Sequence, residues 1–298
     1  MSAQRVIGVD LGGTKILAGS IDGEGRVLDR HEVPTPTGSQ AELREGFAAA
    51  IEPLAGAGMA ALGFGIPSVI DRATGLSLGS NNIPLEDVAL GKVMSERFGV
   101  PATVENDGNA AALAEWRLGA GRGVENLVML TLGTGVGGGL VIGGALFRGW
   151  AELGHIVVVA DGPPCQGNCT GRGHLEALAS GSAADRAAEK LWGAGATAEL
   201  LVGRASEGDA AALEALSGIG HLLGAAIGSL FNIFGTELVV IGGGFGTAAA
   251  EFLFPAALEV AHREALLESS RVSLRIVKAE LGSDAGLIGA GLLALEAL

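Results

Sequence analysis

Short runs of apolar residues, separated by glycine-rich turns, recur along this chain and predict strands. Three such runs open the sequence in an order typical of an antiparallel meander. Further along, the order returns with an apolar run, a Gly-Thr turn and a second apolar run. The strands predicted by these runs cover residues 5–10, 16–21, 26–33, 126–132 and 136–142. The repetition predicts an α/β fold that is duplicated, with two similar lobes and a cleft between them.

Apolar residues at intervals of three and four predict helices between the strands. The predicted helices cover residues 39–54, 87–98, 110–118, 209–234 and 286–298, and further strands cover residues 61–66, 101–105, 237–241 and 271–277. In the longest helix, Gly220, Gly224 and Gly228 share one face. Such a face admits either the backbone of a neighbouring helix or a flat ligand, and the sequence leaves both open.

Composition and charge narrow the class of protein. The 298 residues suffice for two lobes, each with its own core. A formal net charge of −14, with scattered Lys and Arg, argues against a nucleic-acid partner, so local dipoles must hold any anionic ligand. No apolar run approaches the roughly 20 residues of a membrane helix, and no charged-then-apolar leader precedes the first strand. We therefore expect a soluble, cytoplasmic protein with no membrane partner.

A polar cluster falls where the strand over 101–105 meets an alanine-rich helix. It consists of Glu105, Asn106, Asp107 and Asn109. Strand ends that face helix starts are where α/β folds place their chemistry. Asp107 is either a helix cap or a general base, and the cluster holds more polar groups than one cap needs. A carboxylate flanked by hydroxyl-binding amides suits removal of a proton from an alcohol.

Two Gly-Thr turns and a third glycine-rich turn follow predicted strands and are candidates for phosphate binding. Their backbone N–H groups and hydroxyls can point at phosphate oxygens. The candidates are Asp10, Gly12, Gly13, Thr14, Lys15, Thr131, Gly133, Thr134, Gly135 and Gly243. The chain has neither a P-loop nor a dinucleotide fingerprint, so those nucleotide sites are not expected. Asp10, at a strand end, suits a magnesium ion held through water.

Two cysteines and two histidines lie in a short Gly-Pro-rich loop. They are His155, Cys165, Cys169 and His174. Two Cys and two His supply the four ligands of a closed structural zinc site; the alternative is two free thiols and two surface imidazoles. Glu152 and Glu176 flank the loop, and a zinc-braced loop would orient both acids.

These motifs together resemble the ROK family of sugar kinases and repressors, in particular its bacterial glucokinases. The resemblance covers essentially the whole chain. It rests on Asp10–Lys15, Glu105–Ala111, Leu132–Gly139, Glu152–His155 and the loop from Cys165 to Glu176, which occur in the family's order. It implies the duplicated actin-like (ribonuclease-H-like) ATPase fold. Residues 1–117 would form the N-terminal lobe, joined by the C-terminal helix 284–298, and residues 118–283 the C-terminal lobe with the zinc loop and the nucleotide site.

The resemblance also implies a function: phosphorylation of the 6-hydroxyl of a hexose by ATP and magnesium, glucose foremost, with Asp107 as the base. The implied hexose contacts are Asn82, Asn106, Asp107, Glu152, His155 and Glu176. Gly12, Thr14, Gly133 and Thr134 would face the phosphates, and His155 would offer one ring nitrogen to sugar and one to zinc. A homodimer or homotetramer is implied as well.

One departure and several alternatives remain. Two residues are inserted after Cys165, and His174 stands where the family has its last Cys; we expect zinc to be kept by a Cys2His2 set. The chain starts directly at its first strand, without a helix-turn-helix, which weighs against the repressor branch. The alternatives are a kinase for N-acetylmannosamine, N-acetylglucosamine, fructose or allose, and a non-catalytic sugar sensor. The phosphoryl donor could also be polyphosphate or another nucleotide.

Overall fold

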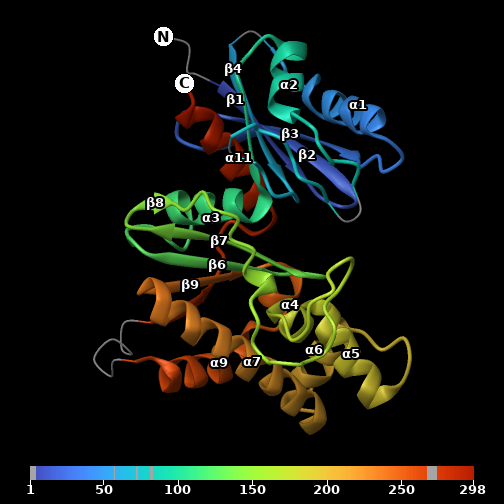
Figure 1. The fold of residues 1–298 in the computed structure, drawn as a ribbon, viewed down its shortest axis with the longest axis vertical. Helices are drawn as coiled ribbons and strands as arrows, with labels where there is room; N and C mark the ends of the chain where they lie inside the picture. The colour runs from blue at the N-terminus through green and yellow to red at the C-terminus, as the bar shows by residue number, and fades with distance from the viewer. Residues whose placement is uncertain (1–4, 57, 72, 81–82, 267–273) are drawn as a thin grey trace. The chain divides into compact units, whose positions relative to one another are not determined.

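The chain divides into two compact units, each with its own sheet and core. The computed structural model describes residues 5–56, 58–71, 73–80, 83–266 and 274–298 (Figure 1). Unit 1 comprises Met1–Leu118, Arg148–Trp150 and Ser283–Leu298, and unit 2 comprises Gly119–Phe147 and Ala151–Gly282. Asn82, a predicted hexose contact, lies outside the described residues.

The sheet of unit 1 combines an antiparallel meander with two parallel strands. Its strands are β1 (Arg5–Leu11), β2 (Lys15–Ile21), β3 (Val27–Pro34), β4 (Met59–Ile66) and β5 (Ala102–Asn106). Their order is β3-β2-β1-β4-β5, with β4 and β5 parallel to β1. The carboxyl ends of β1, β4 and β5 therefore meet at one edge of the sheet.

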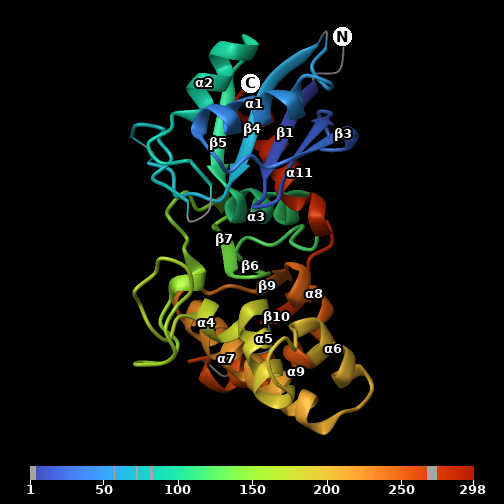
Figure 2. The same cartoon turned by 90° about the vertical axis from the view of Figure 1, so that its right-hand side faces the viewer.

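Two helices cover each face of this sheet. The elements are α1 (Gln40–Ile51), α2 (Leu90–Phe98), α3 (Asp107–Leu118) and α11 (Ala285–Glu296). Helices α1 and α11 lie on opposite faces of the sheet (Figure 2). Phe64 of β4 packs edge-on against Phe47 of α1, whereas the neighbouring Gly63 faces α11, where a methyl group would overlap the carbonyl of Ala290. Alternation along β4 thus places large residues under α1 and glycines under α11, which can approach closely.

The sheet of unit 2 repeats the arrangement of unit 1. Its strands are β6 (Leu127–Leu132), β7 (Val136–Ile142), β8 (Ala145–Leu146), β9 (Leu238–Gly242) and β10 (Arg275–Lys278). The order β10-β9-β6-β7-β8 again has an antiparallel meander on one side of the first strand and two parallel strands on the other. The predicted duplication of an α/β fold is confirmed.

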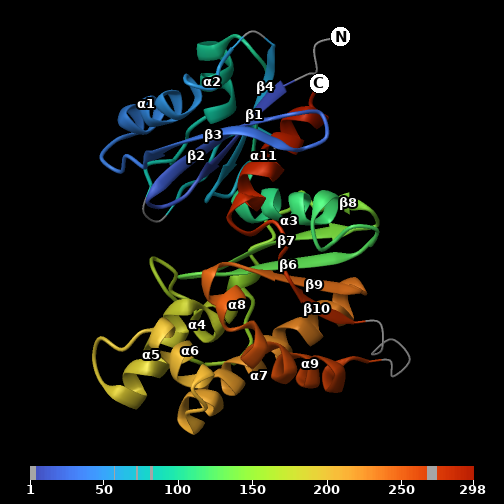
Figure 3. The ribbon, with the colours of Figure 1, turned by 180° about the vertical axis from the view of Figure 1, so that it is seen from behind.

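The described residues of unit 2 form six α-helices. They are α4 (Leu175–Ala179), α5 (Gly181–Trp192), α6 (Ala198–Ser206), α7 (Ala210–Phe234), α8 (Gly244–Ala248) and α9 (Ala250–Glu264), and the 3-10 turns η1 (Leu153–His155) and η2 (Gly282–Asp284) complete the described helical segments. Helices α7 and α9 run side by side (Figure 3).

The glycine face of α7 packs against the backbone of α9. A methyl group at Gly220 would lie 2.7 Å from the Leu253 carbonyl oxygen, and one at Gly224 would overlap that of Ala257. This settles the two alternatives left by the sequence in favour of helix packing. In the part of the chain that the structure describes, α7 alone is long and apolar enough to cross a bilayer, with a mean hydropathy of 1.5. The prediction of no such stretch missed it, although α7 contributes Leu216, Leu223 and Ile227 to the core.

Some predicted elements differ from the structure. Helix α2 begins at Leu90 rather than 87, because Asp87 adopts a left-handed φ of 54° and its N–H donates to the Ser77 carbonyl. The glycine-rich turn after β9, for which no following element was predicted, leads into α8. The last strand predicted over 271–277 is described only from residue 274 onward. Helices α4, α5, α6, α8 and α9 were not predicted.

Candidate functional site

The carboxyl ends of three strands bring Asp10 and Asp107 to one edge of the sheet in unit 1. Asp10 of β1 pairs in register with Gly65 of β4, and Gly65 pairs with Glu105 of β5. Asn106 ends β5 and Asp107 begins α3 directly afterwards. A Cβ at Gly65 would lie 3.4 Å from the Ala110 Cβ and 3.7 Å from the Asp107 Cα, so the start of α3 packs directly over β4.

Asn106, and not Asp107, performs the capping of α3. The Asn106 Oδ1 accepts from the Asn109 N–H at 3.1 Å, which is the bond of a helix cap to the third residue of the helix. Asp107 Oδ1 accepts from the Gly108 N–H at 2.8 Å. Of the two roles that the sequence left open for Asp107, the cap is thus filled by its neighbour.

The buried side chains of Glu105 and Asn109 stabilise the junction between β5 and α3. Glu105 is 1% exposed and Asn109 is fully buried. Glu105 Oε1 accepts from the Asn106 N–H at 3.0 Å and from the Asn109 side-chain amide at 3.1 Å. Because a buried carboxylate that accepts two hydrogen bonds resists displacement, this pair holds the backbone of Asn106 and Asp107 in place.

Burial makes both aspartates weaker acids than usual. Burial, and secondarily the charge of Asp107, raise the pKa of Asp10 to about 7, against a smaller lowering effect of Lys15. Burial likewise raises the pKa of Asp107, although the hydrogen bond from the Gly108 N–H works against it. Paired acids with raised pKa values at a strand edge are a frequent feature of catalytic sites.

The first predicted phosphate turn is exposed and held by its own backbone. Gly12 N–H donates to the Lys15 carbonyl at 2.9 Å, and the Thr35 hydroxyl donates to the Gly12 carbonyl at 2.8 Å. Gly13 and Thr14 are exposed at its tip. Lys15 forms a 2.7 Å ion pair with Glu32 on β3.

The second predicted phosphate turn, Gly133–Gly135, lies in unit 2 on the start of α5. The Gly133 carbonyl accepts from the Gly181 N–H at 2.7 Å, and the Thr134 carbonyl accepts from the Ser182 hydroxyl at 2.8 Å. Gly243 adopts a φ of 81° and packs so closely on the end of β6 that a methyl group would overlap the Leu132 carbonyl. The structure therefore brings together Gly243 and the turn, two parts of the predicted nucleotide site.

The four predicted metal ligands converge in unit 2. His155, Cys165, Cys169 and His174 each offer one donor atom within 4.8 Å of the others. The two Nδ1 atoms lie 3.3 Å apart, and the sulfur-to-Nδ1 distances are 3.7 Å for Cys165 and His155 and 3.6 Å for Cys169 and His174. Tetrahedral zinc with bonds of about 2.0 to 2.3 Å requires donor separations of about 3.3 to 3.8 Å. The donor set fits zinc.

The flanking acids have separate surroundings. Glu176 Oε2 accepts from the Val136 N–H at 2.9 Å, and its Oε1 lies 3.9 Å from the Cys165 sulfur, so this side chain links the Cys/His loop to the β6–β7 turn. Glu152 is exposed at the start of η1. Because the Nδ1 of His155 faces the cluster, its Nε2 points elsewhere.

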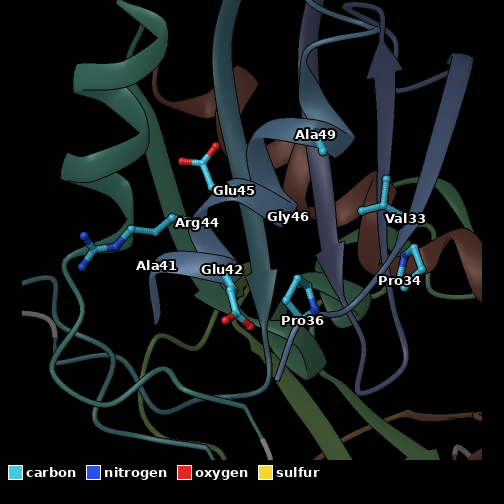
Figure 4. A pocket seen from close by; sticks show the side chains of 9 residues that line it. All are labelled: Val33, Pro34, Pro36, Ala41, Glu42, Arg44, Glu45, Gly46 and Ala49. Atoms are coloured by element: carbon cyan, nitrogen blue, oxygen red, sulfur yellow. The ribbon is translucent and has the colours of Figure 1, made fainter. Parts of the chain in front are cut away.

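Two hollows in unit 1 lie apart from Asp10 and Asp107. One of about 710 Å³ is framed by the end of β3 and by α1 (Figure 4). Its lining residues are Val33, Pro34, Pro36, Ala41, Glu42, Arg44, Glu45, Gly46 and Ala49. The other, of about 470 Å³, lies against the loop that includes Ser80 and Ile83. Neither hollow could be predicted from the sequence, because the residues that line them do not form a recognisable sequence motif.

Comparison with known proteins defines the class and then the family. The glucokinase of Streptomyces coelicolor is 35% identical over 315 residues, which cover 97% of each chain. A ROK hexokinase structure from Thermus thermophilus has a TM-score of 0.87 at 37% identity, covering 99% of each chain. A Streptomyces griseus ROK glucokinase in complex with glucose and AMPPNP has a TM-score of 0.84 at 33% identity, covering 98% of this chain and 99% of that one.

These similarities establish the actin-like ATPase fold of sugar kinases. The ROK family model matches residues 6–297, and the chain belongs to the ROK family.

Proposed function

We propose that this protein is a hexose kinase that transfers a phosphoryl group from ATP to the 6-hydroxyl of glucose. One observation carries the proposal. Asp107 stands at the carboxyl edge of a sheet with its helix already capped by Asn106, which leaves its carboxylate to act as a base. The similarity to a glucokinase and to a structure that binds glucose and AMPPNP supports the choice of substrates.

Asp107 accepts the proton of the 6-hydroxyl as that oxygen attacks the γ-phosphorus of ATP, the bond from this phosphorus to the β,γ-bridging oxygen breaks and ADP leaves. Its raised pKa makes it a stronger base than an exposed aspartate, as long as it is ionised. Activity should therefore fall as the pH is lowered through the pKa of Asp107. Asn106 and Glu105 keep the base in position through the hydrogen bonds described above.

The two Gly-Thr turns are proposed to bind the phosphates of ATP through their N–H groups and hydroxyls. The carboxylate of Asp10 fits a magnesium ion, since it is buried beside a second acid and lacks a strong cationic partner to hold it ionised. A bound magnesium ion would neutralise charge that develops on the transferred phosphoryl group.

The Cys/His cluster is proposed to hold a structural zinc ion, because all four ligand positions would be filled by protein atoms. The proposed hexose contacts are Asn82, Asn106, Asp107, Glu152, His155 and Glu176. His155 would use Nδ1 for the metal and Nε2 for the sugar. We further propose that the protein acts in glycolysis in the cytoplasm and assembles as a homodimer or homotetramer.

Replacement of the base tests the proposal. Asp107→Asn should lower kcat for glucose phosphorylation about 10²- to 10⁴-fold, the usual contribution of a general base. Glucose binding measured by calorimetry should persist. Asp29→Asn, which removes an exposed carboxylate of β3, is the matched control and should retain wild-type kcat. Near wild-type turnover by Asp107→Asn would refute the mechanism.

A coupled assay across sugars and donors separates the alternatives. The panel should include glucose, N-acetylmannosamine, N-acetylglucosamine, fructose and allose, each with ATP and with polyphosphate. The proposal expects the highest kcat/KM for glucose with ATP. Sugar binding without any turnover would instead identify a non-catalytic sensor.

A further inference from the structure

The side chain of Gln166 joins the Cys/His loop to the junction between α4 and α5. Its Nε2 donates to the Glu176 carbonyl at 3.2 Å and to the Ser180 hydroxyl oxygen at 2.9 Å. The Glu176 carbonyl belongs to the last turn of α4, whose carbonyls have no partner within that helix. Gln166 directly follows Cys165, so its backbone is held by the same loop that gathers the metal ligands.

Ser180 is the N-cap residue of α5 and directly precedes its first residue, Gly181. It is fully buried, and its Oγ accepts from the Ala183 N–H at 3.1 Å as the helix cap. The Gln166 amide is a second donor to the same oxygen. Gln166 therefore fixes the side chain that sets the first turn of α5.

The first residues of α5 form hydrogen bonds with the Gly133–Gly135 turn and hold it in place. Besides the bonds from Gly181 and Ser182 to its carbonyls, a methyl group at Gly181 would lie only 2.8 Å from the Gly133 oxygen. The helix and the turn are therefore in direct backbone contact. A shift of the start of α5 therefore moves the turn with it.

We propose that Gln166 is a positioning residue that couples the Cys/His loop to the nucleotide-binding turn Gly133–Gly135. The chain of contacts runs from the Cys/His loop through Gln166 and Ser180 to the first residues of α5. From there it reaches the Gly133–Gly135 turn. The inference rests on the proposed function, in which this turn faces the phosphates of ATP. Filling the metal site strengthens nucleotide binding through this chain of contacts.

The test measures binding of AMPPNP to the full-length protein by calorimetry, with magnesium present. Gln166→Met keeps the length of the side chain and removes its donors. Because one or two hydrogen bonds are lost, the Kd for AMPPNP should rise about threefold to tenfold. Asn168→Ala, at an exposed position of the same loop, is the matched control and should bind like wild type. Zinc content, measured in both variants, should equal that of wild type.

Two further measurements separate positioning from a general loss of structure. In steady-state assays, KM for ATP should rise for Gln166→Met by the same factor as Kd, with kcat changed less than twofold. Removal of zinc with a chelator, followed by resupply of magnesium, should weaken AMPPNP binding to wild type but change that of Gln166→Met little further.

Unchanged AMPPNP affinity in Gln166→Met would overturn the inference. The inference would also be overturned if Gln166→Met and zinc removal weakened AMPPNP binding by fully additive free energies, because the two effects would then be independent. In either case wild type would still bind AMPPNP and phosphorylate glucose. A wild-type protein that did neither would instead refute the proposed function.

Discussion

Asp10→Asn should change how the stability of unit 1 depends on pH. The pKa of Asp10 is about 7 in the folded protein and an ordinary 3.8 in the unfolded chain. Between these values the folded protein keeps a proton that the unfolded chain has released. The free energy of unfolding of wild type therefore falls as the pH rises through this window, by about 1.36 kcal/mol per pH unit, and levels off above pH 7.

The difference between the two pKa values sets the size of the effect. It corresponds to about 4 kcal/mol of stability that wild type has at pH 4 and has lost at pH 8. An asparagine does not titrate, so the unfolding free energy of the variant minus that of wild type should grow by about 4 kcal/mol from pH 4 to pH 8. In an Asp107→Asn background the growth should be smaller but should persist, because burial is the larger cause.

Urea denaturation followed by tryptophan fluorescence measures this difference. A Trp192→Phe background leaves Trp116 and Trp150, both in unit 1, as the reporters. Asp29→Asn, at an exposed position of the same unit, is the control for removal of one negative charge. A difference between Asp10→Asn and wild type that stays flat from pH 4 to pH 8 would refute the burial of Asp10 beside Asp107.

Three further substitutions test the cap, the helix contact and the metal cluster. Asn106→Ala should lower the unfolding free energy of unit 1 by about 1 kcal/mol in urea denaturation, through loss of the cap, and an unchanged midpoint would contradict that role. Gly224→Ala should lower the unfolding free energy of unit 2 by about 1–3 kcal/mol through overlap with α9, whereas Gly218→Ala on the open face of α7 should be neutral or stabilising; equal effects would contradict the packing. His174→Ala should reduce bound zinc, measured by elemental analysis, well below that of the exposed control His221→Ala, and equal zinc contents would exclude His174 as a ligand.

The strands and the duplication could be predicted because buried strands carry a local signal. Apolar runs such as 5–10 and 126–132, each ending in a Gly-Thr turn, correspond closely to β1 and β6. The start of α2 could not be predicted, since it depends on the pairing of Ser77 with residues 87 and 88, which are distant in sequence. Helices α4 and α6 are short, with five and nine residues. Helix α5 is amphipathic, but the residues it buries are glycine and alanine, so it shows no spacing of large apolar side chains.

The polar cluster around Asp107 could be recognised in the sequence, but the role of each of its residues could not. Asn106 and Asp107 are both good capping residues, and only the hydrogen bond to the Asn109 N–H shows which one caps α3. The proximity of Asp10 and Asp107 follows from strand register, which a single sequence does not reveal. The role of Gln166 likewise depends on contacts across 10 and 14 residues of chain.

Helix α11 belongs to unit 1, although the whole of unit 2 precedes it in the sequence. It covers the face of the sheet that carries Gly8 and Gly63, and 166 residues separate Leu118 from Ala285, where α11 begins. At the usual rate of translation, the ribosome needs about 8 to 33 s to make them. During that interval the nascent sheet presents an uncovered apolar face, to which a chaperone of the holdase type would bind. Folding of unit 1 can finish only after unit 2 has been synthesised.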